Sequence, residues 1–118
     1  FTEQYYAACK RCLTPGGILV TQNGVPFLQP AELRGTLGIL RKLFADARCY
    51  LATVPTYAGG PMAFGWASDN AELRETPLDV LEQRFASAKI ATRYYNPAVH
   101  LGAFALPGYV ADLVAAKL

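Results

Sequence analysis

Two polar side chains follow predicted strands at positions where a ligand could bind. Gln22 ends the apolar run 18–22, and Tyr57 lies in the turn 55–61, just past a second predicted strand. Ligands of open α/β sheets bind outside the carboxyl ends of the strands, so both residues would face one crevice if their strands run parallel. The Gln22 amide donates and accepts hydrogen bonds, and Tyr57 offers an aromatic wall and a hydroxyl group. The pair suits a small ligand with amine ends and an apolar middle. The structural alternative is that Gln22 caps a strand and Tyr57 stabilises a turn.

The cysteine and histidine residues do not form a set of metal ligands in the sequence. Cys9 and Cys12 make a C-x-x-C motif, but no second ligand pair accompanies it and His100 is the single histidine. We therefore expect no metal site. Both cysteines share helical spacing with Tyr5 and Leu13, which predicts that they pack as small hydrophobic residues. His100 is predicted to form a hydrogen bond within a packed C-terminal segment.

Patterns for hydrolysis and phosphate binding are missing from the sequence. Ser68 and Ser87 do not lie in a G-x-S-x-G elbow. The glycine pairs at 16–17 and 59–60 lack the remaining residues of a phosphate-binding loop. The cluster 94–96 (Tyr-Tyr-Asn) could line a pocket, but we interpret its aromatic rings as part of a core.

The composition predicts a folded α/β domain. Of the 118 residues, 53% are hydrophobic and 17% are charged, so a core can form and disorder is not expected. The net charge is +2 with mixed signs and no basic stripe, which argues against nucleic-acid binding. No apolar run reaches the roughly 18 residues of a membrane span. Three cysteines without a pairing framework indicate a reducing compartment, and hence the cytoplasm.

The first elements alternate between helix and strand. A helix over residues 1–13 ends at 15–17 (Pro-Gly-Gly), and the run 18–22 is typical of a strand buried on both faces of a parallel sheet. A second helix opens at Gln29-Pro30, where proline is tolerated in the first turn. Its inner face is predicted to contain Leu33, Leu37, Leu40 and Phe44, and its outer face Glu32, Arg34, Arg41 and Lys42.

The later elements predict a hairpin and further helices. Strands over 48–54 and 62–68 are joined by a short turn, which makes them antiparallel neighbours. Thr76 and Asp79 resemble a capping box that opens a helix to about residue 86. Residues 94–103 are predicted to be irregular or briefly helical. A last helix over 108–118 would turn Val110, Leu113 and Val114 inward. Together the elements predict helices on a mostly parallel sheet with the hairpin at one edge.

Several segments together resemble the spermidine synthase family. Residues 13–22 (LTPGGILVTQ) resemble the family's strand that ends in glutamine, and 54–60 (VPTYAGG) resemble its P-T-Y-x-x-G turn. Residues 93–100 (RYYNPAVH) and 104–107 (FALP) resemble its Y-Y-N-x-x-x-H and F-x-L-P segment. These matches follow the family's order and cover nearly the whole chain.

The resemblance implies an α/β fold. We expect residues 1–118 to form the C-terminal half of a Rossmann-like sheet of the S-adenosylmethionine-methyltransferase type, ending in an antiparallel hairpin with flanking helices. The implied reaction transfers an aminopropyl group from decarboxylated S-adenosylmethionine to putrescine. A small β domain, the nucleoside-binding half and an aspartate base in a D-x-x-D-P loop are all expected upstream of Phe1. No catalytic, metal-binding or cofactor-binding residue is therefore expected within residues 1–118.

The resemblance carries two substrate-binding roles to this sequence. Gln22 matches the family's glutamine near the attacking amine, and Tyr57 matches its tyrosine in the diamine pocket. His100 and Tyr95 match further motif positions, and we assign them to packing. Leu101 departs from the family, which often has arginine after the histidine.

These features predict an aminopropyltransferase as the full-length protein, acting in the cytoplasm as a homo-oligomer (dimer or tetramer) without nucleic acid or membrane partners. The isolated 118-residue chain is predicted to be inactive. The alternatives are a related putrescine N-methyltransferase, a noncatalytic homologue and an oligomerisation module.

Overall fold

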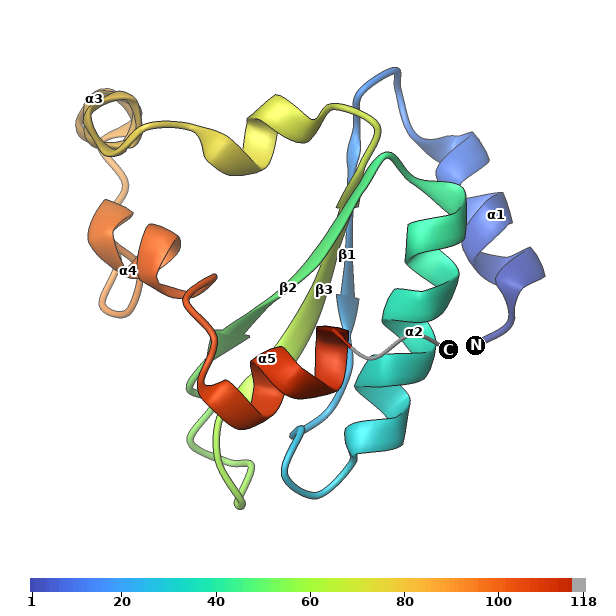
Figure 1. The fold of residues 1–118 in the computed structure, drawn as a ribbon. Helices are drawn as coiled ribbons and strands as arrows, with labels where there is room; N and C mark the ends of the chain where they lie inside the picture. Colours follow the sequence, from blue (N-terminus) through green and yellow to red (C-terminus); the bar gives the residue numbers. More distant parts are fainter. Residues whose placement is uncertain (116–118) are drawn as a thin grey trace.

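A three-stranded antiparallel sheet forms the centre of the computed structural model, which describes residues 1–115 (Figure 1). The strands are β1 (Ile18–Gln22), β2 (Asp46–Ala52) and β3 (Met62–Ser68), and their order in the sheet is β1-β3-β2. The connection between β2 and β3 is short, so β3 returns antiparallel beside β2, as predicted.

The position of β3 corrects the expected sheet arrangement. The sequence predicted a mostly parallel sheet with the hairpin at one edge, but β3 also pairs antiparallel with β1, from Ile18 opposite Ser68 to Gln22 opposite Phe64. β1 and β2 therefore run in the same direction without touching, because β3 lies between them. Their carboxyl ends still lie at the same end of the sheet, as the argument about the crevice required.

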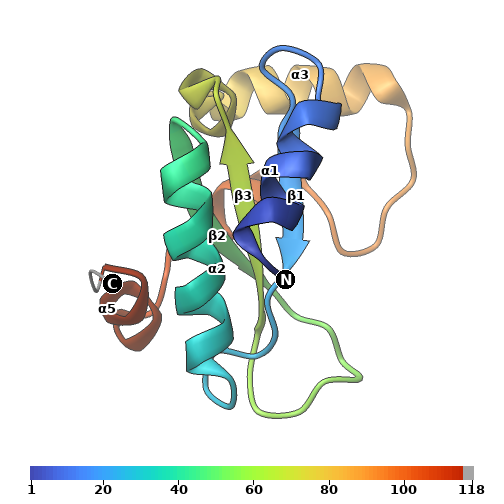
Figure 2. The same cartoon turned by 90° about the vertical axis from the view of Figure 1, so that its right-hand side faces the viewer.

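Two helices, α1 (Glu3–Cys12) and α2 (Pro30–Leu43), cover one face of the sheet (Figure 2). Thr2 caps α1, since its side chain accepts a hydrogen bond from the Tyr5 amide, and Pro30 occupies the first turn of α2 as predicted. The inner face of α2 is confirmed, because the four predicted residues are all buried: Leu33, Leu37, Leu40 and Phe44. They pack with Ala47, Cys49, Ala63 and Ala67 of the sheet.

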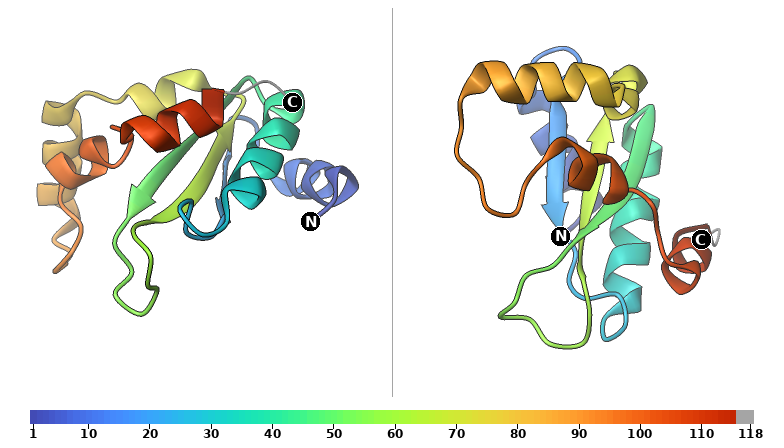
Figure 3. Two further views of the ribbon diagram at one scale, coloured as in Figure 1. Left: turned by 60° about the horizontal axis from the view of Figure 1, so that its bottom comes forward. Right: turned by 90° about the vertical axis from the view of Figure 1, so that its left-hand side faces the viewer.

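The remaining helices lie toward the other face and the β2 edge (Figures 1 and 3). A 3₁₀ turn (Ala71–Glu75) leads to α3 (Leu78–Ala88), which is followed by α4 (Pro97–Gly102) and α5 (Gly108–Ala115). The α4 segment reaches the β2 edge, where the Leu51 amide donates to the Ala103 carbonyl at 3.0 Å. α5 packs beside α2 and buries Val110 completely, as predicted. The predicted helix extended to 118, and residues 116–118 lie outside the described part.

Three local predictions are wrong. Pro77, not Thr76, is the N-cap of α3; the Thr76 hydroxyl instead donates to the Leu73 carbonyl at 2.9 Å. β1 is not buried on both faces, because Ile18 and Val20 are exposed on the face that α1 and α2 do not cover. Cys12 is exposed rather than packed.

A bidentate ion pair ties the 3₁₀ turn to the start of β2. Arg74 donates to the buried Asp46 carboxylate from Nε at 2.9 Å and from Nη2 at 3.1 Å. This fork geometry compensates the burial of the carboxylate. Hydrogen bonding with Asp46 also raises the pKa of Arg74. None of the helices in the described part of the chain is long and apolar enough to cross a membrane.

Candidate functional site

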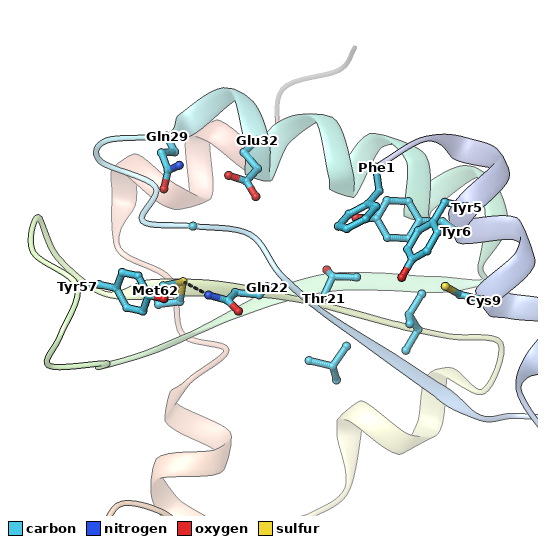
Figure 4. Close-up of a pocket in the computed structure, with 13 residues that line it drawn as sticks. Phe1, Tyr5, Tyr6, Cys9, Thr21, Gln22, Gln29, Glu32, Tyr57 and Met62 are labelled. Carbon is cyan, nitrogen blue, oxygen red and sulfur yellow. Dashed lines mark hydrogen bonds between the residues drawn. The ribbon is translucent and has the colours of Figure 1, made fainter.

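A pocket of about 500 Å³ opens along β1 and past its carboxyl end, between α1 and the turn that follows β2, and we call it the strand-end pocket (Figure 4). Both predicted site residues, Gln22 and Tyr57, line it. Gln22 is the last residue of β1, and Tyr57 lies in the turn between β2 and β3. Met62, the first residue of β3, lies between them. The structure thus brings the two predicted residues to one pocket, while their roles in binding stay a prediction.

The Gln22 side chain is exposed and weakly held. Its Nε2 atom donates a long hydrogen bond to the Met62 sulfur, with 3.8 Å between the two atoms. A thioether is a poor acceptor, so the amide can exchange this contact for a ligand at little cost.

The backbone beneath Gln22 is fixed by Asn23, which is 1% exposed. Its Oδ1 atom accepts hydrogen bonds from the Gly65 amide at 3.0 Å and the Thr21 hydroxyl at 2.6 Å. The backbone amide of Asn23 donates to the Ala63 carbonyl at 2.9 Å. Local sequence patterns did not indicate this anchor, which holds the end of β1 against β3.

The Tyr57 turn packs against the loop that follows β1. The Tyr57 amide donates to the Val54 carbonyl at 3.0 Å, which closes the turn, and the ring is 49% exposed. Gly59 has φ +97°, and a Cβ atom there would lie 2.6 Å from Leu28 Cδ1. The positive φ favours glycine at this position, and the missing side chain lets Leu28 pack against the turn.

Aromatic rings from the start of the chain form another wall of the pocket. Phe1 stacks on Tyr5 with ring centroids 4.5 Å apart, and Tyr6 meets both rings edge to face. Tyr6 is buried, while Tyr5 remains exposed. Hydrogen bonding with the Cys9 side chain raises the pKa of Tyr5. These rings give the pocket an apolar side opposite the Tyr57 turn (Figure 4).

Two polar pocket residues were missed in the sequence analysis. Gln29 lines the pocket and its Oε1 atom accepts a hydrogen bond from the Val25 amide at 3.3 Å. Glu32 also lines it; the residue is exposed, as helical periodicity predicted, but its position at a pocket was not predicted. The available signal was position rather than periodicity, because the first turn of a helix that follows a strand starts near the end of that strand.

A second pocket, of about 230 Å³, lies between β2, β3 and α4, and we call it the aromatic pocket. Its rings pack on one another: Phe104 lies 5.4 Å from Tyr50 and 5.7 Å from Trp66 between centroids. Tyr95 Oη and His100 Nδ1 are 2.8 Å apart, so the predicted hydrogen bond of His100 is confirmed. Burial lowers the pKa of His100.

Tyr94 and Tyr95 differ from the core placement that the sequence predicted. They line the aromatic pocket and remain 54% and 38% exposed. The Tyr94 hydroxyl accepts a hydrogen bond from the Thr53 amide at 2.9 Å. Both rings therefore cover the sheet from outside instead of filling its interior.

The cysteines are free thiols in different surroundings. Cys9 is partly buried at the strand-end pocket, and Cys12 is exposed. Cys49 lies in the core beneath α2, where burial raises the pKa of its thiol to about 11. In residues 1–115, no three histidine, cysteine or acidic side chains come together as metal ligands.

Comparison with known proteins decides the family. The profile of the spermine/spermidine synthase domain matches residues 1–77. The chain belongs to this family. It is 56% identical over 114 residues to polyamine aminopropyltransferase 1 of Pseudomonas aeruginosa, and 55% identical over 113 residues to the polyamine aminopropyltransferase of a Ruegeria species. These alignments cover 97% and 96% of the chain but 40% of each relative, so the chain spans two fifths of their length.

Solved structures of the family share the fold. A crystal structure of spermidine synthase in complex with the transition state analogue AdoDATO superposes with a TM-score of 0.85 at 27% identity, covering 98% of this chain and 38% of that one. Spermidine synthase from Thermotoga maritima gives a TM-score of 0.84, also at 27% identity, covering 98% of this chain and 39% of its own. The predicted family and its methyltransferase-like α/β fold are thus confirmed.

Proposed function

We propose that the full-length protein containing this chain transfers an aminopropyl group from decarboxylated S-adenosylmethionine to putrescine. The products are spermidine and methylthioadenosine. The observation that carries the proposal is the strand-end pocket itself, where Gln22 and Tyr57 converge from separate elements of a spermidine synthase fold.

The reaction requires that one amine be aligned and deprotonated. The neutral amine nitrogen attacks the aminopropyl carbon bonded to the sulfonium, the carbon–sulfur bond breaks, and methylthioadenosine leaves with the electron pair. The proton lost by the amine goes to a base, which we assign to an aspartate of the full-length protein outside residues 1–118. Gln22 and Tyr57 supply neutral hydrogen-bonding groups that orient the attacking amine, and the adjoining apolar surface accommodates the methylene chain.

We assign the nucleoside site mainly to the part of the protein that this chain does not include. On that basis, the 118-residue chain alone forms no spermidine. The full-length protein acts in the cytoplasm as a dimer or tetramer. Analytical ultracentrifugation would test this oligomeric state.

The proposal is tested with Tyr57→Phe and Gln22→Ala in the full-length protein. Each variant is expected to lower kcat/KM for putrescine about 100-fold, because a hydrogen bond to the reacting amine is lost. Binding of decarboxylated S-adenosylmethionine is expected to stay within about twofold of wild type. Unchanged putrescine kinetics in both variants would refute the site.

Product analysis separates the proposal from its closest alternative. Wild-type protein is incubated with putrescine and either donor, decarboxylated or intact S-adenosylmethionine. Spermidine from the decarboxylated donor supports the proposal. N-methylputrescine from the intact donor would instead identify a methyltransferase on the same fold, and no product with either donor would indicate a noncatalytic homologue.

A further inference from the structure

Glu32 is the one charged side chain among the residues that line the strand-end pocket of the described chain. It projects from the first turn of α2, and Figure 4 shows its carboxylate directed from that helix toward the side of the pocket that holds Gln22. The other polar side chains of the lining are neutral amides and hydroxyl groups, with no lysine, arginine or histidine. The pocket therefore presents a single negative charge and no compensating positive side chain.

The Glu32 carboxylate has no partner within residues 1–115. The ion pairs of this part of the chain involve other acidic residues: Glu3, Asp46, Asp69 and Glu75. Its side chain also makes no hydrogen bond there. Glu32 is an exposed residue that lines the pocket, so its carboxylate oxygens are open to a ligand there.

The lack of a side chain at Gly24 leaves room for the Glu32 carboxylate beside the backbone. Gly24 has φ +74°, and a Cβ atom there would lie 3.1 Å from Glu32 Oε2 and 2.5 Å from Gln29 Oε1. The absence of a side chain lets both residues fold over the backbone two positions after Gln22. The carboxylate thus lies close to the strand end, although ten positions separate Glu32 from Gln22 along the chain.

We infer that Glu32 binds the ammonium group of the diamine that does not react, and so selects diamines over monoamines. This inference rests on the proposed function. A diamine must lose a proton at the attacking nitrogen, while an alkylammonium at the other end keeps its charge at neutral pH, since its pKa lies near 10. The neutral Gln22 and Tyr57 suit the first end, and an unpaired carboxylate suits the second.

The test uses the full-length protein and two acceptors of the same length, putrescine and n-butylamine. Glu32→Gln is expected to lower kcat/KM for putrescine about 30-fold, mainly through KM, and to leave n-butylamine within about twofold. The preference for the diamine then shrinks by a similar factor. Glu32→Asp, which retains the charge, is expected to recover part of the preference.

Glu82→Gln on α3 is the matched control, because Glu82 is an exposed helical glutamate outside the pocket. The melting temperature of each variant is measured as well, since an acidic residue in the first turn also stabilises a helix. Equal loss with both acceptors, or none, would overturn the role of Glu32. If wild-type protein transfers no aminopropyl group to putrescine, the proposed function itself fails, and this outcome is distinct because it appears before any variant is compared.

Discussion

The strand-end pocket and the aromatic pocket both contain several aromatic side chains but differ in how their polar atoms are satisfied. In the aromatic pocket, Tyr95 pairs with His100 and the Tyr94 hydroxyl accepts from the Thr53 amide, while the rings contact one another. In the strand-end pocket, Gln22 contacts only a thioether and the Glu32 carboxylate is without a partner in the described residues. Trp66 is the exception on the aromatic side, since its buried Nε1 atom lacks an acceptor there.

This difference separates packing from binding. A side chain whose polar atoms are already satisfied contributes to stability, and its removal costs folding free energy. A side chain with unsatisfied polar atoms at an open pocket contributes little to folding, and its removal weakens ligand binding instead. Variants in the two pockets should therefore affect different measurements.

The largest effect on stability is expected from Phe104→Ala. Phe104 contacts Tyr50, Trp66 and His100, so its loss opens the aromatic pocket and lowers the free energy of unfolding by about 3 kcal/mol. Urea denaturation of the full-length protein measures this change. By contrast, Gln22→Ala is expected to stay within about 0.5 kcal/mol of wild type. Equal destabilisation by both variants would contradict the comparison.

Asn23→Ala tests the anchor beneath the strand-end pocket. The change leaves the buried Gly65 amide without its acceptor, and we expect a loss of about 2 kcal/mol in unfolding free energy. Because the end of β1 is released, turnover of putrescine should fall as well. Thermal denaturation and kinetics on the same preparation measure both effects. A loss of turnover with an unchanged melting temperature would show that Asn23 contacts the ligand directly.

Gly24→Ala disturbs the pocket from its loop. The positive φ is strained for alanine, and the new methyl group meets Gln29 and Glu32, so a destabilisation of about 1 kcal/mol is expected. KM for putrescine should rise more than kcat falls, since Glu32 is displaced while Gln22 remains. Gly102→Ala is the control, because a Cβ atom there meets nothing within 4 Å.

The smallest effect is a pH dependence from the aromatic pocket. Burial lowers the pKa of His100 below its usual value of 6.5, so the unfolded chain binds the proton more readily than the folded protein. Stability is then lost as the pH falls through 6.5 toward the lowered pKa. Melting temperatures of wild type and His100→Gln, compared at about pH 7.5 and about pH 5.5, isolate this contribution. An equal decrease in both proteins would assign the pH dependence to other groups.

Most of the elements could be predicted from local sequence. The buried face of α2 follows from helical periodicity, Pro30 marks its start, and β3 occupies the predicted range 62–68. These features depend on residues close together in the chain. The convergence of Gln22 and Tyr57 was also predicted, because it depends only on the direction of β1 and β2.

The order of the strands and the full pocket lining could not be predicted in this way. Local patterns do not indicate that β3 lies between β1 and β2, since strand order depends on contacts between distant segments. Glu32 was assigned to the solvent-facing side because periodicity tells only which side of a helix is polar. It does not distinguish a side chain at a polar pocket from one in bulk solvent. Asn23 combines a loop-forming residue type with complete burial, and only the contact with β3 explains this combination.

The placement of β3 also sets the spacing between the ends of β1 and β2. Neighbouring strands lie about 4.8 Å apart, so one intervening strand separates the axes of β1 and β2 by about 10 Å. Gln22 belongs to one of these strands and the Tyr57 turn continues the other, while Met62 of β3 forms the floor between them. The antiparallel strand thus keeps the two strand ends apart, and a ligand that touches both side chains must reach across Met62.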